Sequence, residues 1–243
     1  AKHRMARRIL TILGTRPEAI KLAPVIHAIE KEPGEFHHAV CVTAQHRDLL
    51  DPFLDWFSIT PQYDLDIMRP NQSLFDVSVA ILRNLEQVLI TESPDIVLVQ
   101  GDTTTAFVSS LAAYYRKVRV GHIEAGLRTG EKYSPFPEEM NRSLTDVLAD
   151  YCFAPTEAAK KNLLNEGVPE SRIFVTGNTV IDALLHTANG LDLSTPPKEL
   201  QMALGDETAY LSLPGYKILL VTGHRRENFG EGFRQICNAL KAI

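Results

Sequence analysis

The sequence contains few of the residues that would mark a disulfide-stabilised, metal-binding or membrane-spanning protein. Its three cysteines, Cys41, Cys152 and Cys237, are an odd number, widely spaced and without a CxxC pair. This pattern predicts reduced core cysteines in a cytoplasmic protein and argues against a cysteine zinc site. No HExxH or comparable histidine cluster occurs, so we expect no bound metal. No apolar run approaches the roughly 20 residues that cross a bilayer, so we expect no membrane span.

Positive charge is also scarce. The 243 residues carry a formal net charge of −5, which gives no electrostatic footprint for nucleic-acid binding. The basic start, residues 2–8, lacks the apolar core of a signal peptide, and we expect it to be a solvated leader. Neither a GxxxxGK[ST] phosphate loop nor a GxGxxG dinucleotide fingerprint is present.

What the sequence does contain is a repeated alternation of β-rich runs and amphipathic helical stretches. Strands are expected at 8–13, 38–43, 95–100, 118–123, 151–154 and 172–176, with a short extended piece near 63–67. Helices are expected at 17–31, 47–57, 104–116, 137–149 and 157–166, with a further long helix capped by Ser73. This order predicts an α/β fold: a doubly wound, Rossmann-like parallel sheet with helices on both faces.

The alternation is interrupted at Gly177. A helix is expected at 178–188, followed by an irregular proline-bearing stretch at 189–215 and a new strand at 217–221. One strand and its flanking helices cannot bury a sheet on both faces. We therefore expect residues 1–176 to form an N-terminal Rossmann-like domain and residues 177–243 to be the incomplete start of a nucleotide-binding domain.

The stretch Gly121–Gly130 is the candidate centre of the site. Here an apolar strand runs into Glu124 and a glycine-bearing turn, and open parallel sheets bind ligands outside the carboxyl ends of their strands. Asp102 follows the most apolar strand, and Glu138 opens a helix shortly after the stretch. We expect these three carboxylates to meet in one crevice, where they can take or give a proton.

Each carboxylate also has a plainer structural interpretation. Asp102 is a suitable N-cap for the helix after it. Glu124, whose burial without a partner would cost several kcal/mol, has Arg128 nearby in the sequence. Glu138 has Arg142 four residues further on, the spacing of an intrahelical ion pair.

Basic residues lie at two other strand ends. Arg16 and Lys21 flank the strand-to-helix turn after Gly14, where free N–H groups and the helix dipole favour an anion such as a diphosphate. The alternative there is a helix start with surface cations. His224 lies between Gly223 and Arg225 at a later strand end, where it could bind phosphate or move a proton.

Taken together, seven ordered motifs resemble the bacterial non-hydrolysing UDP-N-acetylglucosamine 2-epimerases. They lie at 14–21, 43–47, 101–105, 121–130, 137–142, 177–182 and 223–227, with the sequences GTRPEAIK, TAQHR, GDTTT, GHIEAGLRTG, PEEMNR, GNTVID and GHRRE. The resemblance runs from about Arg8 to the last residue.

The resemblance implies a two-domain fold of the glycosyltransferase-B kind, with a UDP-sugar bound between the domains. It also implies interconversion of UDP-N-acetylglucosamine and UDP-N-acetylmannosamine through 2-acetamidoglucal, without a nicotinamide cofactor. A homodimer and a role in cell-envelope polysaccharide biosynthesis are implied as well.

Residue roles follow from the matched motifs. Positions implied to bind substrate or act in catalysis are Arg16, Lys21, Asp102, Glu124, Arg142 and His224, with Glu138 as a further catalytic candidate. Asp102 is the first choice for the base. Gln45 matches a position at which relatives bind a second UDP-N-acetylglucosamine as an allosteric activator, and Arg225 is expected near it.

Three alternatives remain open. They are a hydrolysing relative that releases free N-acetylmannosamine, a glycosyltransferase with the same fold, and a non-catalytic nucleotide-sugar binding fragment. Relatives extend beyond this C-terminus, so we expect the chain as given to show little turnover.

Overall fold

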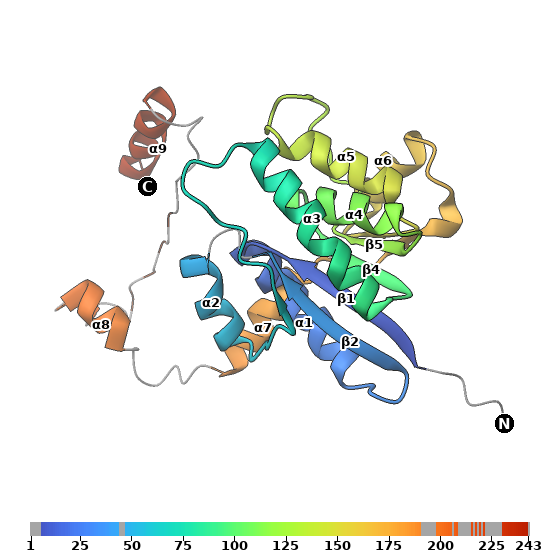
Figure 1. Ribbon diagram of the computed structural model, residues 1–243. Coiled ribbons are helices and arrows are strands. Elements are labelled where there is room, and N and C mark those ends of the chain that lie inside the picture. Colours follow the sequence, from blue (N-terminus) through green and yellow to red (C-terminus); the bar gives the residue numbers. More distant parts are fainter. Residues whose placement is uncertain are drawn as a thin grey trace. The chain divides into compact units, whose positions relative to one another are not determined.

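The structure, a computed structural model, describes residues 6–43, 47–190, 198–205, 207, 208, 215, 217, 219, 221 and 230–242. The chain divides into two compact units, residues 1–190 and 191–243. The first unit contains the sheet and its helices (Figure 1). In the second, the structure describes two helices, α8 (Lys198–Leu204) and α9 (Glu231–Lys241).

The first unit is built on a seven-stranded parallel sheet with the order β3-β2-β1-β4-β5-β6-β7. Its strands are β1 (Arg7–Leu13), β2 (Phe36–Val42), β3 (Tyr63–Asp64), β4 (Ile96–Gln100), β5 (Arg119–Ile123), β6 (Tyr151–Ala154) and β7 (Ile173–Val175). The strand order reverses between β1 and β4. That reversal is the topological switch point, beside which open parallel sheets bind ligands.

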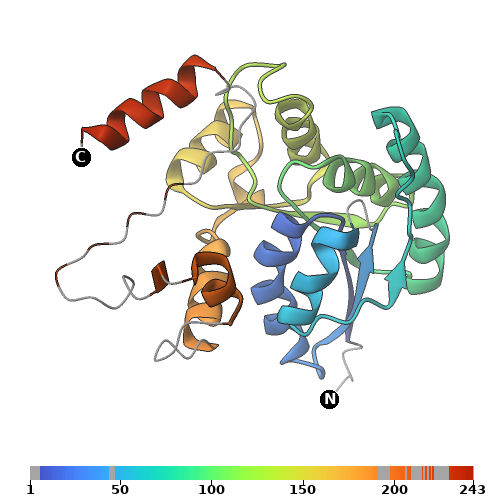
Figure 2. The ribbon, with the colours of Figure 1, turned by 90° about the vertical axis from the view of Figure 1, so that its left-hand side faces the viewer.

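Helices lie on both faces of this sheet (Figures 1 and 2). They are α1 (Arg16–Glu30), α2 (Arg47–Trp56), α3 (Leu74–Glu92), α4 (Thr104–Tyr115), α5 (Glu138–Leu148), α6 (Glu157–Asn165) and α7 (Val180–Gly190), with a 3-10 turn at Glu170–Arg172. The predicted doubly wound α/β fold is confirmed.

The two hydrophobic cores follow from the alternation of side chains along each strand. On β1, Leu10 and Ile12 belong to the core beneath α3, α4 and α6, whereas Ile9 and Leu13 belong to the core beneath α1, α2 and α7. All strands are parallel, so their carboxyl ends and the turns that follow meet at one edge of the sheet.

The long helix α3 shows how the sequence sets local structure. Ser73 forms the expected N-cap, with a capping box in which Ser73 and Asp76 satisfy each other's backbone N–H groups. Its apolar positions spaced by three and four are Leu74, Val77, Ile81, Leu85, Val88 and Leu89. Five of these six are buried, while Leu74 in the first turn is 40% exposed. Ser73 therefore fixes the start of the helix, and its apolar stripe fixes the buried face.

The boundary between units lies later in the chain than the glycine at 177 suggests. Helix α7 packs against α1, and its Ala183 is buried in the same core as Leu22 and Ile26. This helix remains with the first unit, which ends at Gly190. The expected strand at 217–221 lies largely outside the described residues.

Candidate functional site

The turn after β1 is joined to the turn after β4 by a buried carboxylate, Glu18. Its Oε2 accepts a hydrogen bond from the Gly14 N–H (3.1 Å), and its Oε1 accepts one from the Thr103 hydroxyl (2.8 Å). Glu18 is 1% exposed, and burial raises its pKa from 4.5 to about 7 despite these donors. It thus holds the two sides of the switch point together.

Thr103, rather than Asp102, is the N-cap of α4. The Thr103 hydroxyl accepts from the Ala106 N–H at 2.9 Å, so the prediction that Asp102 caps this helix is wrong. Threonine fills the position because its backbone is extended and its hydroxyl reaches the N3 amide. The Asp102 side chain is consequently available for other contacts.

Asp102 instead forms an ion pair with Arg142 of α5 through its Oδ2. Asn141 of the same helix donates to the Asp102 carbonyl at 3.0 Å. A third of the Asp102 side chain remains exposed. The start of α5 is therefore fixed against the turn after β4.

The predicted pairing of Arg142 with Glu138 is wrong. Arg142 contacts Asp102 and, at 3.2 Å, the Oε2 of Glu139 one residue further along α5. Glu138 is half-buried in the first turn of α5. Because Glu139 and Arg142 are three residues apart, they lie on the same face of α5, the face that contacts Asp102 in the turn after β4.

Glu139 binds the last two residues of the Gly121–Gly130 stretch through their backbone amides. Its Oε1 accepts from the backbone N–H groups of Thr129 and Gly130, both at 2.9 Å. Burial opposes ionisation of Glu139, but these two amides, together with the Thr129 hydroxyl and the charge of Arg142, hold its pKa below the ordinary value. The sequence reasoning missed this carboxylate, although it lies in the acidic cluster beside Glu138.

Glu124 is held at the end of β5 by an ion pair, as its structural interpretation expected, but the partner is not Arg128. Its partner is Lys21 of α1, whose Nζ lies 2.7 Å from Oε1 and 2.6 Å from Oε2. The expected partner, Arg128, instead binds Asp146 (2.8 Å) and Glu166 (2.6 Å). The positive φ of Glu124, +70°, turns the chain away from the strand at this point, a conformation that costs a non-glycine residue free energy.

Two amide side chains complete the surroundings of Glu124. Gln100, the last residue of β4, donates to Oε2 at 2.6 Å, and Asn178 donates to Oε1 at 3.2 Å. The carboxylate also lies against Gly101, since a Cβ added there would come within 3.8 Å of Oε2. Glu124 therefore lies directly beside the turn that carries Asp102.

The structure thus brings together part of the expected site. Glu124 meets Lys21, and Asp102 meets Arg142, at the carboxyl edge of the sheet. Arg16 is exposed at the start of α1, with its guanidinium 5.7 Å from the centre of the Phe53 ring. A common meeting point for Asp102, Glu124 and Glu138 stays a prediction.

The remaining expected residues, Gln45, His224 and Arg225, lie outside the described residues. Within the described part of the chain, no group of three His, Cys, Asp or Glu side chains could hold a metal ion. Nor is any helix in that part long and apolar enough to span a bilayer.

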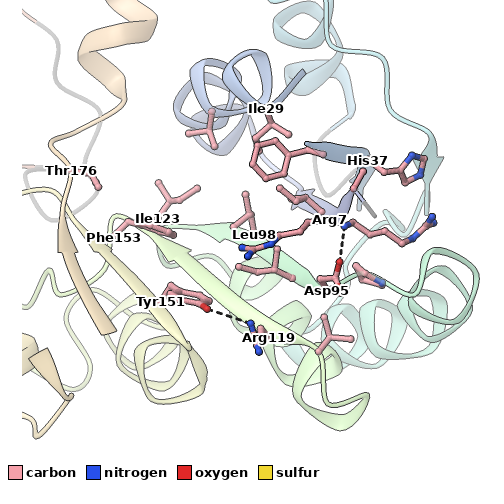
Figure 3. Close-up of a pocket in the computed structure, with 18 of the residues that line it drawn as sticks. Arg7, Ile29, His37, Asp95, Leu98, Arg119, Ile123, Tyr151, Phe153 and Thr176 are labelled. Carbon is pink, nitrogen blue, oxygen red and sulfur yellow. Dashed lines mark hydrogen bonds between the residues drawn. The ribbon is translucent and has the colours of Figure 1, made fainter. Parts of the chain in front are cut away.

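A pocket of about 1380 Å³ lies against the sheet beside Val25 and Ile29 of α1 and extends to Ile123 and Thr176, at the carboxyl ends of β5 and β7 (Figure 3). Its floor is apolar, with Leu98, Ile123 and Phe153, and basic residues Arg7 and Arg119 mark its rim near the start of β1 and β5. The carboxylates described above do not line it. We therefore assign the candidate site to the turns that carry these carboxylates and not to this pocket.

Comparison with known proteins gives the family. Residues 27–243 match the protein family described as UDP-N-acetylglucosamine 2-epimerase. The chain is 55% identical over 236 residues to the UDP-N-acetylglucosamine 2-epimerase of Salmonella typhimurium, which covers 97% of this chain and 61% of that protein. This chain belongs to the UDP-N-acetylglucosamine 2-epimerase family.

Solved structures agree with this assignment. The UDP-GlcNAc 2-epimerase of Neisseria meningitidis, crystallised with UDP-GlcNAc, superimposes with a TM-score of 0.86 at 50% identity, covering 97% of this chain and 62% of that one. An S. aureus MnaA–UDP structure gives a TM-score of 0.81 at 46% identity, covering 97% of this chain and 59% of that one. A lipopolysaccharide outer core galactosyltransferase, WaaB, shares the fold alone, at 17% identity and a TM-score of 0.52.

The resemblance of the seven motifs to UDP-N-acetylglucosamine 2-epimerases is therefore confirmed, and the non-hydrolysing branch stays a prediction. The epimerase-family chain spans about 61% of the length of the Salmonella and Escherichia coli relatives. For this chain, the ligands and the activity of those longer proteins are therefore proposals.

Proposed function

We propose that this protein, at the length of its relatives, interconverts UDP-N-acetylglucosamine and UDP-N-acetylmannosamine by inverting sugar carbon C2. The observation that carries the proposal is the position of Glu124, held by Lys21 and Gln100 directly beside the turn of Asp102 at the switch point. This is where an open parallel sheet presents reactive side chains to a ligand. The relatives named for the same activity support the assignment.

The proposed reaction is an elimination followed by a re-addition. A carboxylate removes the C2 proton, the C2–H electrons form the double bond to C1, and the C1–O bond breaks as UDP leaves. The resulting 2-acetamidoglucal then receives a proton on the other face of C2 while UDP adds back to C1. Atoms and electrons balance without an oxidant, so the step needs no nicotinamide.

The contacts of the carboxylates suggest a different role for each in the proposed reaction. Both oxygens of Glu124 are taken by Lys21 and by the amides of Gln100 and Asn178, so this side chain is fixed in place. Asp102 keeps a third of its side chain exposed while Arg142 orients it. Asp102 therefore remains our choice for the base, with Glu124 and Glu138 as the candidates that protonate or orient the other face.

Cations are needed where the diphosphate departs, because negative charge develops on the leaving oxygen. Arg16 is exposed at the start of α1, where the free N–H groups of the first turn already favour an anion. Lys21 lies one turn further along the helix and is shared with Glu124. We propose that Arg16, Lys21 and His224 hold the diphosphate.

Regulation and assembly form a second part of the proposal. We infer that a second UDP-N-acetylglucosamine acts as an activator through Gln45 and Arg225. We also infer a homodimer, because apolar side chains on α4 and α5 stay exposed: Tyr114 60%, Tyr115 65% and Val147 72%. The buried, unpaired thiols of Cys41 and Cys152 fit a cytoplasmic setting.

Product analysis tests the reaction and separates the alternatives. A protein at the relatives' length should convert UDP-N-acetylglucosamine into UDP-N-acetylmannosamine, seen by chromatography of the intact nucleotide sugars. Free N-acetylmannosamine and UDP would indicate a hydrolysing enzyme instead. Transfer of the sugar to an added acceptor would indicate a glycosyltransferase, and binding without conversion a non-catalytic module.

A further inference from the structure

A buried histidine, His122, joins the turns that carry the candidate site residues. It lies on β5, two residues before Glu124, and is fully buried. Its Nε2 lies 2.7 Å from the Gly101 carbonyl oxygen, and its Nδ1 lies 2.5 Å from Asp146 Oδ1. A backbone carbonyl can only accept a hydrogen bond, so Nε2 carries a proton.

The second ring nitrogen also carries a proton. Asp146 Oδ2 accepts from the Gly126 N–H (3.0 Å) and from Arg128 Nη2 (2.8 Å), both of which favour the ionised carboxylate. Burial opposes ionisation of Asp146, yet its charged and hydrogen-bonding neighbours hold its pKa below the ordinary value, and Arg128 and the Gly126 N–H favour the carboxylate whatever the charge of the ring. An ionised carboxylate only accepts, so both contacts of the ring are satisfied when Nδ1 donates as well and the ring carries two protons.

The groups around the ring fit this charge. Arg128 is balanced by Glu166 as well as by Asp146, which leaves one carboxylate oxygen of Asp146 to the ring. On the neighbouring strand, burial and then Asp146 raise the pKa of Cys152 to about 12, so its thiol stays neutral. Among the described residues, Asp146 is the carboxylate that pairs with the ring, and the two side chains are buried, at 0% and 1% exposed.

The network ties three segments to one another. The Gly101 peptide is held on both sides, since its carbonyl accepts from His122 and its N–H donates to the Ile123 carbonyl at 2.9 Å. Asp146 lies on α5, one turn beyond Arg142, which contacts Asp102. Gly126, which donates to Asp146, lies two residues beyond Glu124. A displacement of the ring would therefore move the turn of Asp102 relative to Glu124 and α5.

We propose that His122 is a positioning residue: a buried imidazolium that fixes the Gly101 carbonyl, and with it Asp102, relative to Glu124 and the start of α5. The assignment of the charge stands on the hydrogen bonds of His122 and Asp146 and on the ion pair between Asp146 and Arg128. The assignment of a role in the reaction rests on the proposed function, because it takes Asp102 to be part of the chemistry.

The first test is nitrogen NMR of the His122 ring in the chain as given. Both ring nitrogens should carry protons at neutral pH. In Asp146→Asn, the amide can donate to Nδ1 while its oxygen still accepts from Gly126, so one ring nitrogen should lose its proton. The matched control is Asp150→Asn, which removes a carboxylate that accepts from the Val120 N–H at 2.9 Å, at the other end of β5. The control should leave the His122 signals unchanged.

A wild-type ring with one unprotonated nitrogen would overturn the proposal, and this measurement does not depend on whether any variant folds. An Asp146→Asn ring that keeps both protons would overturn it as well, since the carboxylate would then not be the partner that holds the second proton.

The second test is kinetic and uses the protein at the relatives' length. A misplacement of about 1 Å at a reacting group can cost up to about 100-fold in rate. Asp146→Asn should therefore lower kcat by about 10-fold or more with little change in KM, whereas Asp150→Asn should change neither. Equal kcat for the two variants would overturn the positioning role. If the wild type itself were inactive, the proposed function and the role in it would fall together, while two protonated nitrogens would still establish the imidazolium.

Discussion

Gly126, in the stretch 121–130, lies in close contact with α6, and replacing it with alanine should lower the free energy of unfolding. The residue has φ +84°, and a Cβ there would lie 2.4 Å from the Ala159 carbonyl oxygen and 2.9 Å from Leu163 Cγ. The first of these atoms belongs to the backbone of α6 and cannot rotate away. The loop or the helix must therefore shift in Gly126→Ala.

Two contributions add to the cost. A left-handed backbone conformation costs a non-glycine residue about 1–2 kcal/mol. Overpacking against a fixed neighbour adds about 1–3 kcal/mol. We therefore expect Gly126→Ala to lower the free energy of unfolding by about 2–5 kcal/mol.

Gly130 provides the matched control on the same loop. It has φ +80° but no atom within 4 Å of an added Cβ, so Gly130→Ala meets only the backbone cost of about 1–2 kcal/mol. Urea denaturation, followed by circular dichroism, measures both variants. Equal losses for the two alanines would show that the loop does not press against α6 and would refute the close approach.

Three further predictions concern the charged groups of the site. In a double-mutant cycle measured by urea denaturation, Lys21→Met and Glu124→Gln should show a coupling free energy of about 1–2 kcal/mol, because the wild-type Lys21 and Glu124 side chains are only 24% and 11% exposed. Additive effects of the two substitutions would contradict the ion pair. Burial raises the folded-state pKa of Glu18 from 4.5 to about 7, so its contribution to the free energy of unfolding is full below pH 4.5 and is lost as the pH rises to about 7. Across that range, the stability advantage of the wild type over Glu18→Gln should shrink by up to about 3 kcal/mol. A difference that stays constant with pH would contradict the buried carboxylate. In a protein at the relatives' length, replacing Asp102, Glu124 or Glu138 by its amide should each lower kcat by about 100-fold or more, and unchanged rates would leave these side chains with structural roles only.

The order of strands and helices was predictable because each element carries its own local signal. Continuous apolar runs such as residues 96–99 of β4 mark buried parallel strands, and the Ser73 hydroxyl marks a helix start. The position of α7 was not predictable in the same way. Gly177 indicates a break, but whether the next helix stays with the first unit depends on its packing against α1.

The partners of the charged residues could not be read from the sequence because they are distant in it. Local spacing favoured Arg128 for Glu124, yet Lys21 is 103 residues away along the chain and reaches it across the switch point. Asp102 and Arg142 are 40 residues apart. Such pairs form where the carboxyl ends of parallel strands meet, and that requires the strand order, which periodicity does not give.

His122 and Glu18 were missed for a different reason. Each is a titratable residue inside an apolar environment, His122 within β5 and Glu18 on the buried side of α1. A polar side chain in a buried strand needs hydrogen-bond partners, so His122 could have been marked as a residue with an undiscovered partner. The identity of that partner, Asp146, again depends on the fold.

In the proposed mechanism, proton transfer at sugar C2 takes place at the turns that follow β1, β4 and β5. Its most direct test is to incubate a protein at the relatives' length with UDP-N-acetylglucosamine in deuterated water and to follow C2 by NMR. Deuterium should enter C2 of both nucleotide sugars in the wild type, and Asp102→Asn should slow this entry by about 100-fold. Unlabelled C2 in the wild type, or unchanged labelling in Asp102→Asn, would contradict this mechanism.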